Sequence, residues 1–243
     1  MDLIESREKE REIIEDHIKS QSTKGKPLQI LEAGCGRRWQ LRLDGIDYVL
    51  TGVDLDATAL KMRKDDIGDL HEAVEGDLRS VQLPEHQYDV IYSSYVLEHI
   101  KGAEQVLNNF NRWVKPGGLV IIRIPDPHSV HGFITRMTPH WFHVLYYRIF
   151  LGFPNAGKPG YEPYPVYYDP VVSRRGIKDF CKKHGFTVMA EYGDGYMRPG
   201  KGIARLLIHS VKVVGSILSL GALSWRHSNL LYILRKQSAA QPA

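Results

Sequence analysis

Apolar and polar positions alternate in blocks along the first half of the chain. Five short apolar runs have the length and composition of buried parallel strands: LQILEAG, YVLTGVDLD, HEAVEGD, YDVIYSS and LVIIRIP. Between them lie segments with helical spacing, of which 57–66 and 103–114 are the clearest. This alternation predicts a doubly wound α/β fold with a mostly parallel sheet.

The alternation stops at Asp126 and resumes near Ser173, which is placed to cap a helix over 174–184. Two later runs, FTVMAEY and NLLYILRK, complete a seven-stranded sheet. Insertions occupy 126–172, after strand five, and 194–228, before the last strand.

We expect a single domain over 1–243. Residues 1–26 have the spacing of a helix that lays a thin apolar stripe on the body. Their dense charge differs from a secretory signal, which predicts a cytoplasmic protein. The two cysteines, Cys35 and Cys181, have no neighbours at metal-ligand or redox spacing, so we expect neither a disulfide nor a metal site.

The segment LEAGCG ends the first predicted strand and offers a ligand a close approach to the backbone. Gly34 and Gly36 allow a sharp turn where a Cβ would intrude. Asp54 ends the second strand, where a carboxylate can accept hydrogen bonds from both hydroxyls of a ribose. The pattern predicts an adenosine-containing cofactor. Trp39 stands where a dinucleotide fingerprint requires its third glycine, which disfavours a dinucleotide.

Five segments in order resemble the motifs of class I S-adenosylmethionine-dependent methyltransferases of the methyltransferase-11/23-like group: LEAGCG, GVDLD, EGDL, YDVIYSSYVLEHI and WVKPGGLVIIRIP. The resemblance covers about residues 28–125 and implies a Rossmann-like fold, S-adenosyl-L-methionine as cofactor and S-adenosyl-L-homocysteine as product. The chain departs from the family at GCGRR, where GCGxG is usual and a long helix follows. We therefore expect a short or irregular first crossover.

The resemblance assigns ten residues to the cofactor. Those of the first motif surround the methionine end, the second motif holds the ribose and adenine, the third contacts the adenine, and two serines border the methionine moiety. In that order they are Glu32, Ala33, Gly34 and Gly36; Asp54 and Leu55; Asp77 and Leu78; and Ser93 and Ser94. Arg37 or Arg38 either pairs with the carboxylate of the cofactor or lies on the surface.

Two histidines are candidate catalytic residues. His99, in LEHI, follows strand four on the motif nearest the methyl group, and a base there would deprotonate an oxygen acceptor. The alternative for His99 is a supporting role, which the family also shows. His140 begins the predicted helix of the first insertion and is the second candidate, although a structural or interfacial role is the alternative.

Charge divides the chain after Asp126. From residue 127 onward there are 15 Lys and Arg against 5 Asp and Glu, whereas the preceding part has 17 against 23. The first insertion also holds 11 of the 24 aromatic residues, as a lid over an acceptor would. These features favour an anionic membrane surface as a partner over nucleic acid, for which no recognition pattern is present.

The second insertion, KGIARLLIHSVKVVGSILSLGALSW, is apolar but interrupted by charge, so a helix lying in the membrane interface is favoured over a membrane span. A homodimer or core helix is the equal alternative. In the interfacial model apolar side chains enter the acyl boundary and basic ones meet head groups; they are Leu206, Leu207, Val211 and Val214, and Arg205, Lys212 and Arg226.

The sequence thus predicts an O-methyltransferase of an amphipathic lipid, isoprenoid or lipid-linked sugar acceptor, peripheral at the inner face of the membrane. A methyltransferase of a soluble small molecule or natural product is the enzymatic alternative. A noncatalytic S-adenosylmethionine-binding regulatory or partner subunit is the alternative from another class.

Overall fold

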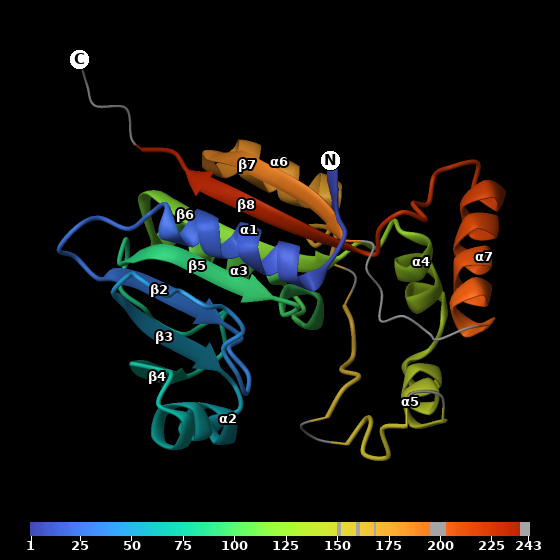
Figure 1. The fold of residues 1–243 in the computed structure, drawn as a ribbon, viewed down its shortest axis with the longest axis horizontal. Helices are drawn as coiled ribbons and strands as arrows, with labels where there is room; N and C mark the ends of the chain where they lie inside the picture. The colour runs from blue at the N-terminus through green and yellow to red at the C-terminus, as the bar shows by residue number, and fades with distance from the viewer. Residues whose placement is uncertain (150–151, 159–160, 168, 195–202, 239–243) are drawn as a thin grey trace.

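The computed structural model describes residues 1–149, 152–158, 161–167, 169–194 and 203–238, with the backbone alone for 203–209 and 211. One sheet of eight strands, in the order β1-β7-β8-β6-β5-β2-β3-β4, forms the centre of the molecule (Figure 1). The strands are β1 Asp2–Ile4, β2 Leu28–Ala33, β3 Tyr48–Asp54, β4 Glu72–Glu75, β5 Tyr88–Ser94, β6 Val114–Pro125, β7 Phe186–Asp194 and β8 Asn229–Lys236. Only β8 runs antiparallel to its neighbours within the described sheet. The predicted doubly wound, mostly parallel α/β fold is confirmed.

The eighth strand and the N-terminal helix differ from the expectation. Residues 1–26 do not form one helix: β1 pairs in parallel with the edge strand β7, and α1 extends only over Arg7–Lys19. Ser6 caps α1 by accepting from the backbone N–H of Lys9 at 3.1 Å. Ile4 is buried in the core. The helical spacing concealed β1 because a three-residue strand has no period of its own.

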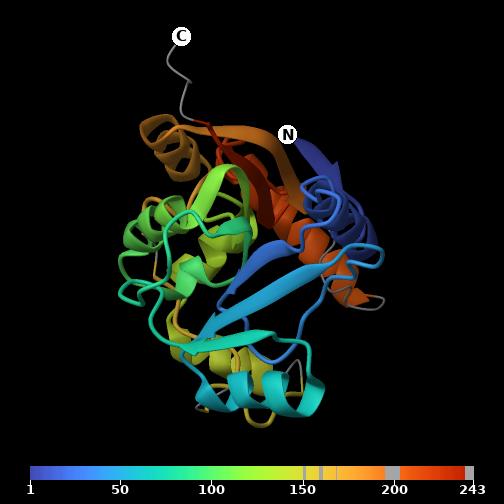
Figure 2. The ribbon, with the colours of Figure 1, turned by 90° about the vertical axis from the view of Figure 1, so that its left-hand side faces the viewer.

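Helices cover both faces of the sheet (Figure 2). On one face α3 (Ala103–Trp113) and α6 (Arg174–His184) pack against the larger core cluster. As expected, Ser173 caps α6 by accepting from the N–H of Gly176 at 3.0 Å. The other face is covered by α1 and by α2 (Ala57–Lys61), which continues as a π-helical turn, η1 (Met62–Ile67).

The first crossover, between β2 and β3, is irregular as expected, with no helix between residues 37 and 47. Leu41 and Leu43 are buried there and pack in the same cluster as residues of α1. The carboxylate of Glu15 on α1 accepts from the backbone N–H of Arg42 at 2.6 Å. The N-terminal helix thus covers the sheet where a crossover helix would lie.

Beyond the carboxyl ends of the central strands lie three helices that we call the cap: α4 (Val130–Met137), α5 (His140–Ile149) and α7 (Ile203–Leu218) (Figure 1). A Cβ at Gly215 of α7 would lie 2.9 Å from the side chain of Val130, so this glycine allows α7 to approach α4 closely. Within the described residues, no helix is both long and apolar enough to cross a bilayer.

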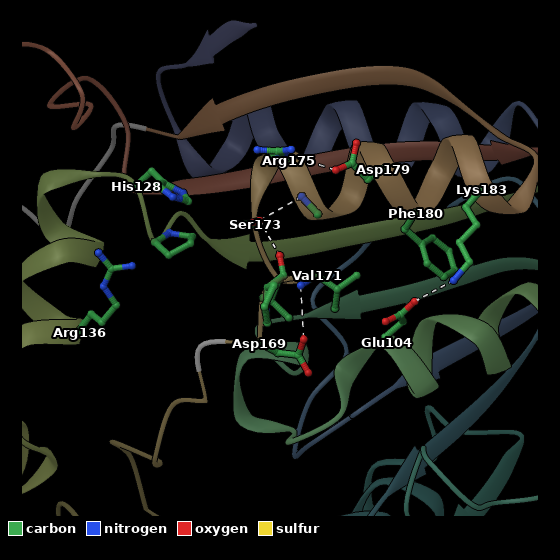
Figure 3. Close-up of a pocket in the computed structure, with 14 residues that line it drawn as sticks. Glu104, His128, Arg136, Asp169, Val171, Ser173, Arg175, Asp179, Phe180 and Lys183 are labelled. Carbon is green, nitrogen blue, oxygen red and sulfur yellow. Dashed lines mark hydrogen bonds and ion pairs between the residues drawn. The ribbon is translucent and has the colours of Figure 1, made fainter.

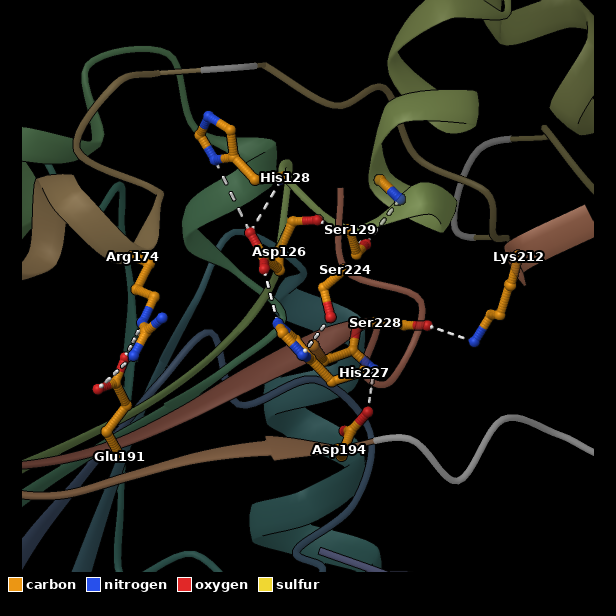
Figure 4. Close-up of polar contacts among 12 residues, drawn as sticks. Asp126, His128, Ser129, Arg174, Glu191, Asp194, Lys212, Ser224, His227 and Ser228 are labelled. Carbon is orange, nitrogen blue, oxygen red and sulfur yellow. Dashed lines mark hydrogen bonds and ion pairs between the residues drawn. The ribbon is translucent and has the colours of Figure 1, made fainter. Parts of the chain in front are cut away.

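The two insertions are joined to the sheet by a buried polar cluster (Figure 4). Asp126, just after β6, and His227, just before β8, lie 2.8 Å apart through Oδ2 and Nε2. His227 Nδ1 lies 2.9 Å from Ser224 Oγ, and the Ser224 carbonyl accepts from the N–H of Val130. Lys212 of α7 is buried and donates to Ser228 at 3.1 Å.

This cluster corrects one sequence expectation, because Lys212 points inward and not toward lipid head groups. Val214 and Arg226 are exposed, as the interfacial model requires. The side chains of Arg205, Leu206, Leu207 and Val211 lie outside the described residues.

Candidate active site

The carboxyl ends of β2 and β5 adjoin at the centre of the sheet, where the strand order reverses. The turn after β2 lies at this position. Gly34 and Gly36 both have positive φ angles, of 73° and 53°. A Cβ at Gly34 would lie 2.3 Å from Val96 Cγ2, whereas one at Gly36 would meet no atom within 4 Å. Gly34 is therefore required by the protein itself, and Gly36 opens onto space that a ligand can occupy.

The carboxylate of Asp54, at the end of β3, faces this turn. Its Oδ2 accepts from the N–H of Gly36 at 2.8 Å, and its Oδ1 accepts from the N–H of Asp56 at 2.9 Å. Each oxygen keeps further acceptor capacity, so the hydroxyls of a ribose can still donate to it. Leu55 beside it is 71% exposed, which leaves its side chain available to a planar ring.

A buried guanidinium lies beneath the turn. Arg63, on η1, is fully buried and donates to Glu32 at 2.6 Å, to the carbonyl of Cys35 at 2.8 Å and to Asp69 at 3.0 Å. Burial raises the pKa of the Glu32 carboxyl, and the cation of Arg63 opposes that shift. Glu32 thus supports the glycine turn through Arg63, and Ala33 beside it is buried.

Sequence reasoning missed Arg63. It stands among charged residues in MRKDD, and nothing local distinguishes it from an exposed arginine. By contrast Arg37 and Arg38 are exposed, and Arg37 approaches Asp56 at 3.4 Å.

Asp77 and Leu78 follow β4. Asp77 forms an ion pair with Arg79 at 2.5 Å, and the hydrogen bonds from Arg79 lower the pKa of the Asp77 carboxyl. Leu78 is buried, and its carbonyl accepts from the side-chain amide of Asn109 at 2.8 Å. Asp77 is therefore held as an anion at the edge where the adenine amine is expected.

The end of β5 combines polar side chains with a strained backbone. Ser93 is buried and its hydroxyl has no partner within the described residues, whereas Ser94 accepts from Arg123 at 3.1 Å. Tyr95, directly after the strand, has a φ of 57°, which is rare for a residue with a side chain. The guanidinium of Arg123 lies 4.7 Å from the Tyr95 ring centroid. Strain of this kind is concentrated at functional sites.

Glu98 and His99 follow on the short helix η2 (Leu97–His99). Glu98 is buried, burial raises the pKa of its carboxyl to about 8, and its Oε2 has no partner among the described residues. His99 Nδ1 lies 2.8 Å from the carbonyl oxygen of Pro165. A carbonyl can only accept, so Nδ1 carries the proton and Nε2 keeps its lone pair.

The residues of the first insertion that reach His99 come from the loop before α6 and not from α5. The ring of Tyr164 meets that of His99 edge to face at 5.7 Å, and the N–H of Tyr167 donates to the carbonyl of Glu98 at 2.7 Å. His140 is exposed at the start of α5, where its ring lies 6.4 Å from that of His143. In Figure 1 α5 lies apart from the end of β5, so the structure does not bring the two candidate histidines together.

A groove of about 540 Å³ opens between α4 and α6 (Figure 3). Its α4 side carries His128 and Arg136, and its α6 side carries Ser173 and Arg175. Arg136 makes no salt bridge within the described part of the chain, and its guanidinium lies 5.8 Å from the Phe133 ring. Its lining also includes the acids Glu104, Asp169 and Asp179, so the groove can take a polar part of a substrate.

These residues fit an adenosine cofactor with a methionine end. Open space lies over Gly36, Asp54 can accept from a ribose, and Leu55 is exposed for a ring. Ser93 and Glu98 each leave a buried polar atom without a partner among the described residues, at the place where a polar ligand is expected. A buried polar atom of this kind is costly unless a partner binds it.

Comparison with known proteins agrees with this geometry. Residues 31–122 match the family model of a methyltransferase domain. Phosphoethanolamine N-methyltransferase 3 of Arabidopsis thaliana is 30% identical over 103 residues, which are 40% of this chain and 21% of that protein. Phosphoethanolamine N-methyltransferase 1 of Zea mays is 31% identical over 109 residues, with the same coverage. The match thus spans about a fifth of the length of these relatives.

Solved structures share the fold over nearly the whole chain. An S-adenosylmethionine-dependent methyltransferase from Mesorhizobium loti has a TM-score of 0.56 at 15% identity, over 91% of this chain and 96% of that one. An S-adenosylmethionine-dependent methyltransferase from Archaeoglobus fulgidus has a TM-score of 0.54 at 18% identity, over 93% and 94%.

Proposed function

Because the chain carries a methyltransferase domain of the class I S-adenosylmethionine-dependent family over residues 31–122, we propose that it methylates an oxygen of an amphipathic acceptor bound beneath the cap. The observation that carries the proposal is the hydrogen bond from His99 Nδ1 to Pro165, which leaves the lone pair of Nε2 to accept a proton, and Glu98 Oε1, 3.9 Å from Nε2, is too far for a hydrogen bond. S-adenosyl-L-methionine supplies an activated methyl group on a sulfonium. The protein aligns the acceptor and removes its proton.

The residues expected to hold the cofactor are those around the central strand ends. Gly34 and Gly36 shape the turn, Asp54 accepts from the ribose, and Asp77 accepts from the adenine amine. Ser93 and Ser94 border the methionine end. Glu32 and Arg63 act indirectly, because they hold the turn from below.

The electrostatics of His99 support a base role. Burial lowers the pKa of its imidazole below the usual value of about 6.5, so the ring is neutral at physiological pH. The activity should therefore be present at neutral pH and fall as the pH drops through this lowered pKa. In the pH profile of kcat/KM, the fall on the acid side (the acid limb) should lie below pH ~6.5.

The experiment compares His99→Gln with His140→Gln. Glutamine at 99 keeps a polar side chain but cannot act as a base, so turnover of labelled cofactor with fractionated membrane lipids should fall about 10²–10⁴-fold. The acid limb should also disappear. His140→Gln should retain the rate and the limb, because His140 lies on α5, apart from His99.

Cofactor affinity, measured by calorimetry, should be unchanged in both variants. An unaltered pH profile in His99→Gln would remove this residue from proton transfer. Cofactor binding without formation of S-adenosylhomocysteine from any extract fraction would instead favour a noncatalytic binding subunit.

The cap supports an amphipathic acceptor. The Tyr164 ring contacts His99, and the backbone N–H of Tyr167 holds the same loop on Glu98, so the loop brings aromatic side chains to η2, while Arg136 offers positive charge at the adjacent groove. An acceptor with an apolar chain and an anionic or sugar head could contact both. Mass spectrometry of extract lipids after transfer of a labelled methyl group should identify it. Labelling confined to the water-soluble fraction would favour a soluble small-molecule substrate.

A second candidate is N-methylation of an amine that also bears a phosphate. The relatives named phosphoethanolamine N-methyltransferases favour it. So does Glu98, whose buried carboxyl can pair with an ammonium group when it ionises. Phosphoethanolamine supplied with labelled cofactor tests it directly. A product with the labelled methyl group on nitrogen would support N-methylation, and a product with it on oxygen, as an ether or ester, would support O-methylation.

A further inference from the structure

We propose that the outer side of the cap docks on an anionic lipid bilayer. The docking surface, which we call the cap surface, consists of the six most exposed large apolar residues of the insertions: Met137, Trp141, Ile149, Ile217, Leu218 and Leu220. The inference goes beyond methyl transfer, and it places the enzyme where an amphipathic acceptor resides.

Exposed apolar residues are concentrated on the cap. Among the described residues, seven large apolar side chains are more than 60% exposed, and the six of the cap surface are among them. The seventh is Leu55, which faces the expected adenine position. No residue of α5 is buried within its described part, although its sequence, HWFHVLYYRI, is mostly aromatic and aliphatic. Apolar exposure of this extent, concentrated on the cap and the turn after α7, is typical of a binding surface.

The α7 helix shows that this exposure is directional. Val214, Ile217 and Leu218 are spaced three and four residues apart and are 52%, 67% and 78% exposed, so they form one outward face. The inward face carries the buried Lys212 and Gly215, which packs on Val130. The helix is therefore already docked on the protein on one side, and its apolar outer side needs another partner.

The turn after α7 adds an independent observation. Leu220 is 97% exposed and has a φ of 53°, a left-handed conformation that costs a branched side chain free energy. Asparagine or glycine would suit this exposed position better in water. An apolar side chain held in strain at the tip of the cap is explained if it enters an apolar phase.

Charge selects the partner. The insertions 126–172 and 194–228 contain eight Lys and Arg against four Asp and Glu. Among the described side chains of the insertions, the exposed basic ones are Arg136, Arg148, Lys158 and Arg226, whereas Lys212 is buried. A symmetric contact with a second copy would bring two such basic surfaces together, which electrostatic repulsion opposes. Anionic head groups complement them, and exposed aromatic residues such as Trp141 are well suited to the membrane interface.

The experiment measures flotation of the full chain with vesicles of phosphatidylcholine alone or containing phosphatidylglycerol, without acceptor. We expect binding to the anionic vesicles that weakens with salt. Substitution of both Ile217→Asp and Leu218→Asp should reduce the bound fraction at least about tenfold, because carboxylates would replace apolar groups at the interface. Met189→Asp is the matched control, since Met189 is 45% exposed on β7, away from the cap, and binding should be retained.

Sedimentation of the same proteins identifies the rival partner. Absence of flotation by the wild type at low salt would overturn the proposal, as would equal flotation of the double variant. A wild-type dimer that the double variant dissociates, with no vesicle binding, would assign the surface to a second copy. Far-UV circular dichroism checks that the variants fold. Because no acceptor is present, the outcome is independent of whether the protein methylates oxygen or nitrogen.

Discussion

Two regions of the molecule differ in where their side chains find partners. One is the carboxyl ends of the central strands, where the cofactor is expected to bind and which we call the cofactor edge; the other is the cap. At the cofactor edge Arg63 is fully buried and bonded to Glu32, Asp69 and a carbonyl of the turn. On the cap no described residue of α5 is buried, and Leu218 is 78% exposed. The cofactor edge is stabilised by the chain itself, whereas the cap surface is left for a partner outside it.

The difference predicts unequal sensitivity to substitution, and the largest effect should come from Arg63→Met. Removing the cation leaves the buried carboxyl of Glu32 without its partner, which should lower the free energy of unfolding by about 3–5 kcal/mol. Urea denaturation measures the change. Arg175→Ala is the control. The Arg175 side chain is 91% exposed, so its ion pair with Asp179 should contribute about 1 kcal/mol or less to stability. Similar losses in the two variants would contradict a structural role for Arg63.

The next largest effect should be a loss of stability on substituting the glycines of the turn, and it should be larger at Gly34 than at Gly36. Gly34→Ala combines a positive φ with a clash against Val96, and should cost about 2–4 kcal/mol of stability. Gly36→Ala has the positive φ but no neighbour, and should cost about 1–2 kcal/mol. Thermal unfolding measures both without cofactor. Calorimetry should then show that Gly36→Ala loses cofactor affinity beyond its modest effect on stability; equal affinity would show that the space over Gly36 is not used.

His227→Leu should have a smaller and more local effect. It removes the hydrogen bonds to Asp126 and Ser224, at a cost of about 1–3 kcal/mol. Amide hydrogen exchange should become faster in α4 and α7 than in β2 and β3, since the cluster joins the insertions to the sheet. His128→Leu is the control, because His128 is exposed and its ring lies 3.9 Å from Asp126. Uniform acceleration over the whole sheet would contradict a local anchor.

Trp141→Ser on α5 should have the smallest effect. Its side chain is 65% exposed, so the free energy of unfolding in solution should change by about 0.5 kcal/mol or less. Chemical denaturation without lipid gives this value. A loss much above about 1 kcal/mol would show that α5 packs more tightly than its exposure indicates.

The strands, the glycine turn and Asp54 could be predicted because their signals are local. A buried strand is a run of apolar residues, and Gly34, Gly36 and Asp54 stand at its ends at motif spacing. The cap loop over His99 could not be predicted, since Pro165 lies 66 residues from His99. For the first insertion the sequence directed attention to His140, the second candidate after His99, because a histidine at the start of a helix is visible locally while its distance from the strand ends is not. The assignment of individual cofactor contacts stays a prediction.

From the sequence alone one could know the order of seven of the eight strands, the glycine turn at which an adenosine cofactor is expected, and the charge difference between the two parts of the chain. Only the tertiary structure decided that Arg63 lies beneath the turn, that Asp126 meets His227 across 101 residues, and that Lys212 points inward while Leu218 points outward. The physical reason is that local patterns record which residues favour burial and which turns the backbone can make. Partners distant in sequence meet only when the sheet brings them together.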